Sequence, residues 1–271
     1  PMNIQRSEVE NPVYDMTFED KHTDAAAAQQ AADTILEALE QAKRPVIMLG
    51  HGVDSSFSQQ KLIRFAQKRQ IPIITSVLAK SVLGYDHPLN FGCIGGAYGH
   101  RYANMIANAK SDLLLCFGIS LCTRQIGTKV HEFARGAKII RIDIDPYNLQ
   151  RDIHENGINE VKLQAETGAV IDCLAKAAAP DTEGISDWLN VCTEIKENLQ
   201  AVDDATPERY PNRMIADLSD MLEDTSAIAV DVGQHMVWSY QSFKNHEGQK
   251  LLFSGGHGAM GYGLPAAIGA Y

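Results

Sequence analysis

Residues 45–52 read PVIMLGHG, a short apolar run that ends in a turn flanked by glycines. Such a run predicts a strand buried on both faces, because a strand with one face in water alternates apolar and polar side chains. Amphipathic stretches, the first over 24–39, separate it from similar runs. Those runs cover residues 71–75, 113–117, 139–143 and 161–163. The alternation predicts an α/β fold, with a parallel, doubly wound sheet covered by helices on both faces.

Changes in composition divide the chain into four parts. Residues 1–23 are polar and irregular, which predicts a linker, and 24–179 carry the alternating pattern of one middle α/β domain. Polar residues and prolines gather over 180–211, which predicts a second linker around one helix. Residues 212–271 begin another α/β domain. The chain does not start with Met and stops inside an apolar helical pattern, so we expect this last domain to be truncated.

The composition excludes several classes of function. Hydrophobic residues make up 45% and charged residues 21% of the chain, and the net charge is −10, as in soluble globular proteins. Lys and Arg form no concentrated patch, which argues against nucleic acid as a partner. No apolar run approaches the roughly 20 residues of a membrane helix, and no secretory signal pattern opens the chain. The five cysteines lack paired spacing, so we expect reduced thiols and a cytoplasmic location.

Ligands of a parallel sheet bind beyond the carboxyl ends of its strands. The predicted ends carry residues 50–52, 75–76, 118–120 and 143–145. Asp143 and Asp145 could form a general acid–base pair, but capping of the turn before Pro146 is the favoured interpretation. Three histidines lack the spacing of metal ligands, so surface or capping roles are expected for His87, His100 and His131.

A glycine-dense run, SGGHGAMGYG at 254–263, follows the predicted strand 251–253. Its Gly256 to Gly261 match a GxGxxG pattern, but no proper βαβ unit precedes it and the chain ends before an acidic partner residue could follow. Glycines at this density bring backbone close to a flat or anionic ligand, or pack a helix tightly on a strand. From composition alone the two interpretations are equally supported.

Two blocks of sequence resemble one family. They are DVGQH at 231–235 with Trp238, and SGGHGAMGYGLPAAIGA at 254–270. Both resemble the acetolactate synthase type of thiamine-diphosphate enzyme, and so do parts of 44–146. The resemblance implies decarboxylation of a 2-keto acid such as pyruvate and transfer of the enamine to an acceptor, in a homodimer or homotetramer. It makes 1–23 the link from a missing N-terminal domain, and 212–271 the start of a cofactor-binding C-terminal domain.

The resemblance also implies which residues bind the cofactor. The Gly258 carbonyl would accept a hydrogen bond from the aminopyrimidine, the Met260 N–H would meet the ring, and the Met260 side chain would bend the cofactor. The cofactor-binding set is Gly233, Gln234 and His235, on the diphosphate, with Gly258, Ala259 and Met260. The alternatives are that Met260 fills a core and that His235 is a surface or capping histidine.

Two catalytic parts are expected outside this chain. The family's catalytic Glu belongs to the missing N-terminal domain, and its Mg²⁺ motif should lie beyond Tyr271. No residue here is therefore assigned to catalysis or to a metal, and we expect the segment alone to be inactive.

The middle domain raises the question of a flavin, which acetolactate synthases bind there. The candidate flavin or nucleotide residues are Gly50, His51, Gly52, Arg124 and Asp143. Ala97-Tyr98-Gly99 and Ser120-Leu121-Cys122-Thr123 replace the family's charged flavin contacts, which argues against FAD.

Two rival functions stay open. One is a simple 2-keto acid decarboxylase, because the acceptor is chosen by residues outside this segment. The other is a non-catalytic nucleotide-binding module built on the middle sheet, in which the glycine run is purely structural.

Overall fold

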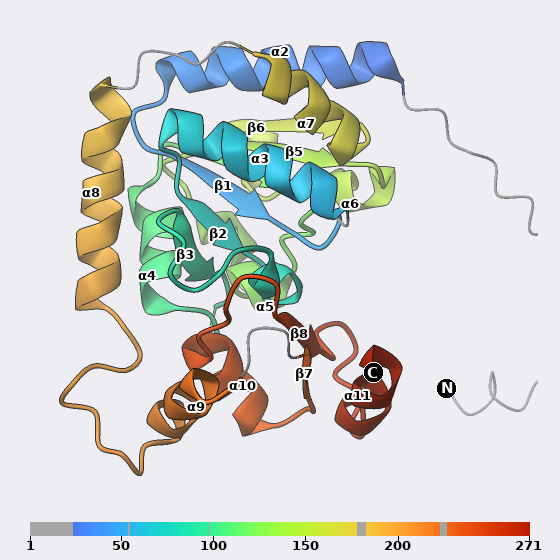
Figure 1. Cartoon of the computed structure of the whole chain (residues 1–271). Coiled ribbons are helices and arrows are strands. Elements are labelled where there is room, and N and C mark those ends of the chain that lie inside the picture. Colours follow the sequence, from blue (N-terminus) through green and yellow to red (C-terminus); the bar gives the residue numbers. More distant parts are fainter. Residues whose placement is uncertain (1–23, 54, 97, 178–182, 223–226) are drawn as a thin grey trace, which may run out of the picture.

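The structure is a computed structural model that describes residues 24–53, 55–96, 98–177, 183–222 and 227–271. Six parallel strands form the larger sheet, in the order β3-β2-β1-β4-β5-β6 (Figure 1). The predicted α/β fold with a parallel sheet is confirmed. The strands are β1 (Pro45–Leu49), β2 (Ile73–Thr75), β3 (Asn90–Cys93), β4 (Leu113–Phe117), β5 (Lys138–Asp143) and β6 (Glu160–Gln164).

Helices cover both faces of this sheet, as a doubly wound fold requires (Figure 1). Ile47 and Leu49 of β1 pack toward one face, and Val46 and Met48 toward the other, so the strand is buried on both sides. The first face is covered by α2 (Ala25–Gln41), α3 (Ser56–Arg69) and α7 (Thr167–Lys176). The second face is covered by α4 (Arg101–Asn104), the π-helical η2 (Met105–Lys110) and α8 (Glu183–Asn198).

Helix α2 begins where the sequence predicts. The Asp24 carboxylate accepts hydrogen bonds from the N–H groups of Ala26 (2.9 Å) and Ala27 (3.1 Å). These are donors that the helix itself leaves unpaired, so Asp24 is the N-cap. The spaced apolar residues of α2 are buried against the sheet.

The sequence missed the elements that have little apolar content. Strand β3 reads NFGC, and the Asn90 side chain bonds the Gly84 carbonyl (2.8 Å) and the Gly92 N–H (2.9 Å). The short helices α5 (Thr123–Ile126) and α6 (Pro146–Gln150) were also missed. The sequence of 129–134 predicts a helix, but the structure has a 3₁₀ turn there, Val130–Glu132. The remaining 3₁₀ helices are η1 (Val77–Val82) and η4 (Glu155–Gly157).

Asp143 and Asp145 are both used in the turn before α6. Asp143 accepts from the Asp145 N–H (2.9 Å), and Asp145 accepts from the Tyr147 N–H (2.9 Å). The capping interpretation is therefore confirmed.

A smaller parallel sheet forms the second part of the molecule. Its strands, β7 (Ala227–Val230) and β8 (Lys250–Phe253), pair so that Val230 lies opposite Phe253. Asn212 precedes an apolar helical pattern in the sequence, which predicts an N-cap, but the structure contradicts this prediction. It is buried, and its amide donates to Ser242 Oγ (2.8 Å), while Tyr210 is the N-cap. The helices here are α9 (Pro211–Asp220), α10 (Gln234–Ser242) and α11 (Gly263–Ala270).

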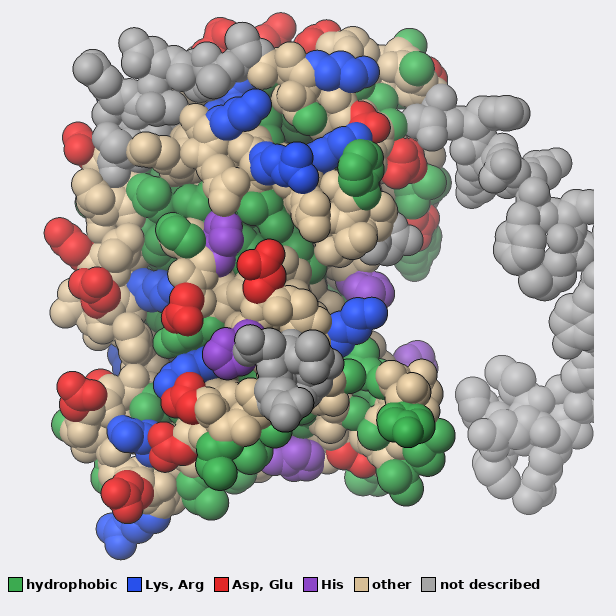
Figure 2. Space-filling view, viewed as in Figure 1, with side chains coloured by type: hydrophobic (Ala, Val, Ile, Leu, Met, Phe, Trp, Pro, Cys, Tyr) green, Lys and Arg blue, Asp and Glu red, His purple; other side chains and the backbone are tan. Residues whose placement is uncertain are grey.

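Helix α11 leaves an apolar surface exposed. Leu264 is 73% and Ile268 is 69% accessible, and Figure 2 shows apolar side chains gathered over this helix. The apolar sequence of this stretch is typical of a buried helix. In the structure, however, nothing among the described residues covers it.

The predicted domain boundaries remain a prediction. Residues 1–23 lie outside the described part of the chain. Within the predicted linker 180–211, α8 packs on the larger sheet, where the Trp188 indole N–H donates to the Pro45 carbonyl (3.0 Å).

The two parts contact each other directly. The Gln241 amide of α10 donates to the Tyr98 carbonyl (3.1 Å), and the Asn245 amide donates to the Leu83 carbonyl (2.9 Å). His100 is 5% exposed at this contact. Its Nδ1 accepts from the Cys93 N–H (3.0 Å), and its ring also bonds the backbone of Gln241.

Burial and, to a lesser extent, the nearby Lys80 lower the pKa of His100 to about 3. In the unfolded chain the imidazole titrates near its ordinary value of about 6.5. Between these values only the unfolded state binds the proton, so His100 makes the protein lose stability as pH falls from about 6.5 toward 3, by at most about 1.4 kcal/mol per pH unit.

We therefore expect His100→Gln to flatten the acid side of the stability profile. The measurement is urea unfolding at pH 4.5, 5.5 and 6.5 for both proteins. The slope of unfolding free energy against pH should be smaller in the variant, whatever its stability at pH 7. Equal slopes would contradict the buried, neutral state of His100.

Candidate cofactor site

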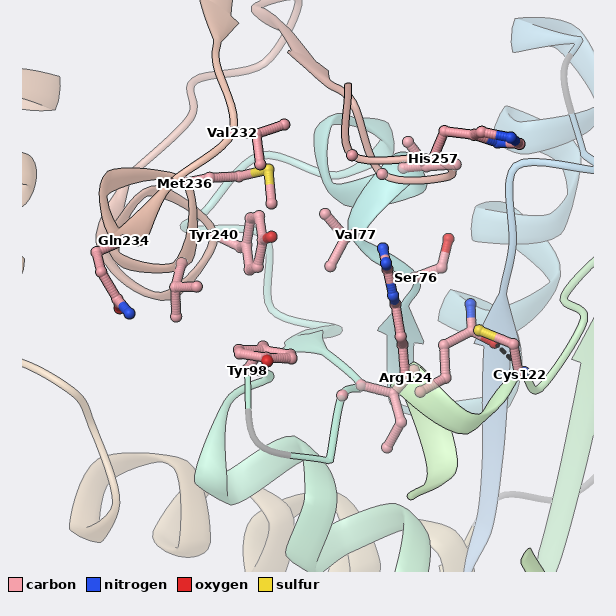
Figure 3. A pocket seen from close by; sticks show the side chains of 18 residues that line it. Ser76, Val77, Tyr98, Cys122, Arg124, Val232, Gln234, Met236, Tyr240 and His257 are labelled. Atoms are coloured by element: carbon pink, nitrogen blue, oxygen red, sulfur yellow. Dashed lines mark hydrogen bonds between the residues drawn. The ribbon is translucent and has the colours of Figure 1, made fainter. Parts of the chain in front are cut away.

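A cavity of about 390 Å³ lies where the carboxyl ends of the two sheets meet. Figure 3 shows Tyr98, Tyr240, Val77 and Arg124 arranged around it. Most of its wall is apolar, with Arg124 as the cation. Its lining includes Ser76, Val77, Leu78, Tyr98, Cys122, Arg124 and Gln125 from the larger part. The smaller part adds Val232, Gly233, Gln234, Met236, Val237, Tyr240, Gly255, His257 and Gly258.

The start of the glycine run is held against the larger part. A Cβ at Gly255 would lie 2.7 Å from Leu78 Cδ2, so only glycine fits there without movement. The next carbonyl, of Gly256, accepts a hydrogen bond from Arg124 Nη1 (3.2 Å). These two contacts fix one end of the run at the cavity.

The centre of the run presents backbone to solvent. Gly258 has φ +66° and lines the cavity, and the Ala259 N–H donates to Ser254 Oγ (3.0 Å). Neither the Gly258 carbonyl nor the Met260 N–H has a hydrogen-bond partner among the described residues. The Met260 side chain is 87% exposed, so the interpretation of Met260 as core filler is wrong.

Residues 233–235 open helix α10. Gly233 is the residue before its first turn, and Gly233 and Gln234 line the cavity. His235 is exposed and does not line it. A Cβ at Gly233 would lie 2.8 Å from the His235 ring, which folds back over the helix start.

The structure thus brings together only part of the predicted cofactor set. Gly233, Gln234 and Gly258 face one cavity, because β7 and β8 are adjacent and parallel and their carboxyl ends lie side by side. The predicted residues outside its wall are His235, Ala259 and Met260.

Asp231 belongs to the block 231–235 but was not included in the predicted cofactor-binding set. Its Oδ1 accepts from the N–H groups of Val232 (2.7 Å) and Gly261 (3.0 Å). The Val232 hydrogen bond lowers the pKa of this carboxyl most, and backbone donors at Gly263, Gly261 and Tyr262 lower it further. The available signal was a carboxylate directly after the apolar run 227–230.

Of the residues proposed for a flavin or nucleotide, one lines this cavity. Arg124 lines the cavity, but Gly50, His51, Gly52 and Asp143 do not. A Cβ at Gly50 would lie 1.9 Å from the Gly118 carbonyl oxygen. The glycines after β1 are therefore required by contact with the turn after β4. Ala97, in the other stretch compared with flavin sites, lies outside the described residues.

The described ranges hold neither a metal site nor a membrane-spanning helix. No group of three or more His, Cys, Asp and Glu side chains there could hold a metal ion. No helix there is long and apolar enough to cross a membrane.

Comparison with known families matches both parts of the molecule. The thiamine pyrophosphate enzyme central domain matches residues 32–174, more than half of the chain. The chain belongs to the thiamine pyrophosphate enzymes. The C-terminal domain of that family, described as its TPP-binding domain, matches residues 231–271.

Individual relatives agree with this assignment. A probable acetolactate synthase large subunit of Methanocaldococcus jannaschii is 33% identical over 250 residues, covering 89% of this chain and 40% of that protein. Acetolactate synthase isozyme 1 large subunit of Escherichia coli K12 is 31% identical over 91% of this chain and 42% of its own length. The acetolactate synthase large subunit of Lactococcus lactis is 28% identical over 92% and 42%. The chain spans about 40% of the length of these relatives.

The resemblance found in the sequence is therefore confirmed. In this thiamine pyrophosphate enzyme, the cavity lies between the two matched segments and takes walls from both.

The packing of Gly50 generates a test of its structural role. Gly50→Ala would press a methyl group into the Gly118 carbonyl, and overpacking of this kind costs about 1–3 kcal/mol or more. We expect a loss of about 3 kcal/mol in urea unfolding. Gly256→Ala is the matched control, because nothing lies within 4 Å of a Cβ there. Equal stability of the two variants would refute the packing explanation.

Proposed function

We propose that this chain is the central and cofactor-binding part of an enzyme that uses thiamine diphosphate and Mg²⁺. The proposed reaction is decarboxylation of a 2-keto acid such as pyruvate, with transfer of the remaining fragment to an acceptor, as in acetolactate synthesis. Relatives named acetolactate synthase large subunit match across most of the chain, which supports this reaction.

The observation that carries the proposal is the unpaired backbone at the centre of the glycine run. The Gly258 carbonyl and the Met260 N–H are an acceptor and a donor two residues apart, without partners among the described residues. An aminopyrimidine offers a complementary donor and acceptor. The exposed Met260 side chain lies free to contact such a ring. The residues present therefore fit the cofactor.

The role of this chain is to bind and orient the cofactor. Gly258 and Met260 would hold the pyrimidine, with Ala259 between them, and Gly233, Gln234 and His235 would contact the diphosphate from the start of α10. When bound, thiamine diphosphate supplies a nucleophilic carbon that lets a 2-keto acid lose carbon dioxide. Orientation of reacting groups is worth several kcal/mol of barrier.

Other elements of the proposal concern the whole protein. The catalytic Glu would come from an N-terminal domain of a second subunit, and the Mg²⁺ ligands from sequence after Tyr271. A homodimer or homotetramer would then be the active form, and residues 1–271 alone would be inactive.

The direct experiment is to supply the full protein with thiamine diphosphate, Mg²⁺ and pyruvate. We expect release of carbon dioxide and formation of acetolactate. Acetaldehyde as the main product would instead favour a simple decarboxylase. Absence of both cofactor binding and turnover would sink the enzyme proposal and favour a nucleotide-binding module.

Substitution at Gly258 tests the pyrimidine position. Gly258→Val adds a branched side chain at the cavity wall, so we expect no measurable binding of thiamine diphosphate by calorimetry. The matched control is Gly248→Val, before β8, since Gly248 also has a positive φ (+89°) and open space around its Cβ position. Both variants carry about 1–2 kcal/mol of backbone strain, so cofactor binding that is equal in the two would contradict the assignment.

We also propose that the protein does not use FAD. Ala97-Tyr98-Gly99 and Ser120-Leu121-Cys122-Thr123 stand in place of the charged flavin contacts, and Asp143 is engaged in its own turn. The purified full protein should therefore lack the flavin absorbance band near 450 nm expected at about one FAD per chain. A stoichiometric band that survives gel filtration would overturn this proposal.

A further inference from the structure

The carboxylate of Asp231 links the end of one strand to the loop that follows the next strand. Asp231 comes directly after β7, whereas Gly261 lies beyond β8 in the glycine run. Asp231 Oδ1 accepts a hydrogen bond from the N–H of Gly261 (3.0 Å), 30 residues later in the sequence, and another from the N–H of Val232 (2.7 Å). The backbone N–H groups of Tyr262 and Gly263 also lower the pKa of this carboxyl.

This carboxylate replaces the cap that helix α11 lacks. The residue before the helix, Tyr262, has helical backbone angles and offers no side-chain hydrogen bond to the first turn. A helix start carries unpaired N–H groups and partial positive charge, which a carboxylate satisfies. Gly263 lies flush against Asp231, since a Cβ there would come within 3.2 Å of Asp231 Cβ.

A second side chain holds the run further upstream. Ser254 follows β8, and its Oγ accepts from the Ala259 N–H (3.0 Å). The Gly258 carbonyl belongs to the same peptide group as the hydrogen-bonded Ala259 N–H. The Met260 N–H lies between that N–H and the Gly261 N–H, which is also hydrogen-bonded. The turn at Gly261 needs the positive φ (+81°) that glycine adopts readily, so the Asp231 hydrogen bond selects one of several accessible backbone conformations.

We infer that Asp231 is a positioning residue, which fixes the Met260 N–H and the Gly258 carbonyl in the geometry that receives the pyrimidine. This inference rests on the proposed function of the glycine run. Asp231 Oδ1 is occupied by the N–H groups of Val232 and Gly261, so the residue acts through the loop and not by touching the ligand.

Three variants of the full protein test the inference. Asp231→Ala removes the acceptor, and Asp231→Asn keeps an oxygen at Oδ1 for Val232 and Gly261. The matched control is Asp217→Ala on α9, where the carboxylate pairs with Arg213 (2.9 Å). Asp217→Ala should match the parent protein in every measurement below.

The first readout needs no cofactor. Backbone amide exchange at 261–263 should be at least about 10-fold faster in Asp231→Ala, because those donors lose their acceptor. Asp231→Asn should restore most of the protection. Unchanged exchange in Asp231→Ala would overturn the inference without bearing on the proposed function.

The second readout concerns the loaded enzyme. We expect Asp231→Ala to weaken thiamine diphosphate binding and to lower kcat by about 10- to 100-fold even at saturating cofactor, because misplacement by about 1 Å costs that much. Asp231→Asn should recover most of both. A residue that only stabilised the fold would lower the melting temperature but leave kcat at saturation intact, and that result would overturn the inference. If the parent protein itself bound no thiamine diphosphate, the proposed function would fail and this inference with it.

Discussion

The parallel pairing of β7 with β8 is the constraint on which the site depends. Parallel strands end at the same edge of a sheet, so the loops after Val230 and Phe253 emerge side by side. One loop brings Asp231 and the start of α10, and the other brings the glycine run. Antiparallel pairing would separate them by the length of a strand. The larger sheet presents its own carboxyl ends to the same space, which is why one cavity receives residues from both parts of the molecule.

The fold could be predicted where burial dictates the sequence. Strands such as β1 and β4 are buried on both faces, so their composition is apolar without interruption and identifies them. Strand β3 was not predicted because it contains Asn90 and Gly92. The Asn90 side chain donates to the Gly84 carbonyl and accepts from the Gly92 N–H, and a local sequence pattern does not reveal these hydrogen bonds. Helices α5 and α6 are too short to show a hydrophobic periodicity. For α6 the sequence signal is the N-cap residue Asp145.

The candidate site was predictable in its location but less so in its parts. The glycine run and the residues after β7 were found from sequence, and Gly233, Gln234 and Gly258 do share a cavity. Composition could not distinguish glycines that serve a ligand from those that serve packing. Gly50 belongs to the second kind, because Gly118 touches it from a turn 68 residues away. Asp231 was overlooked because its partners at 261–263 become neighbours only through the sheet.

The contacts of Leu78 with Gly255 and of Arg124 with Gly256 have a thermodynamic consequence. In each contact, a cavity-wall residue of the larger part touches the glycine run of the smaller part. The cavity therefore exists only while the two parts are docked. Any ligand that binds there must therefore favour the docked arrangement by mass action. Occupancy would couple the melting of the α/β middle part to that of the smaller sheet, so that the two parts unfold as one cooperative unit.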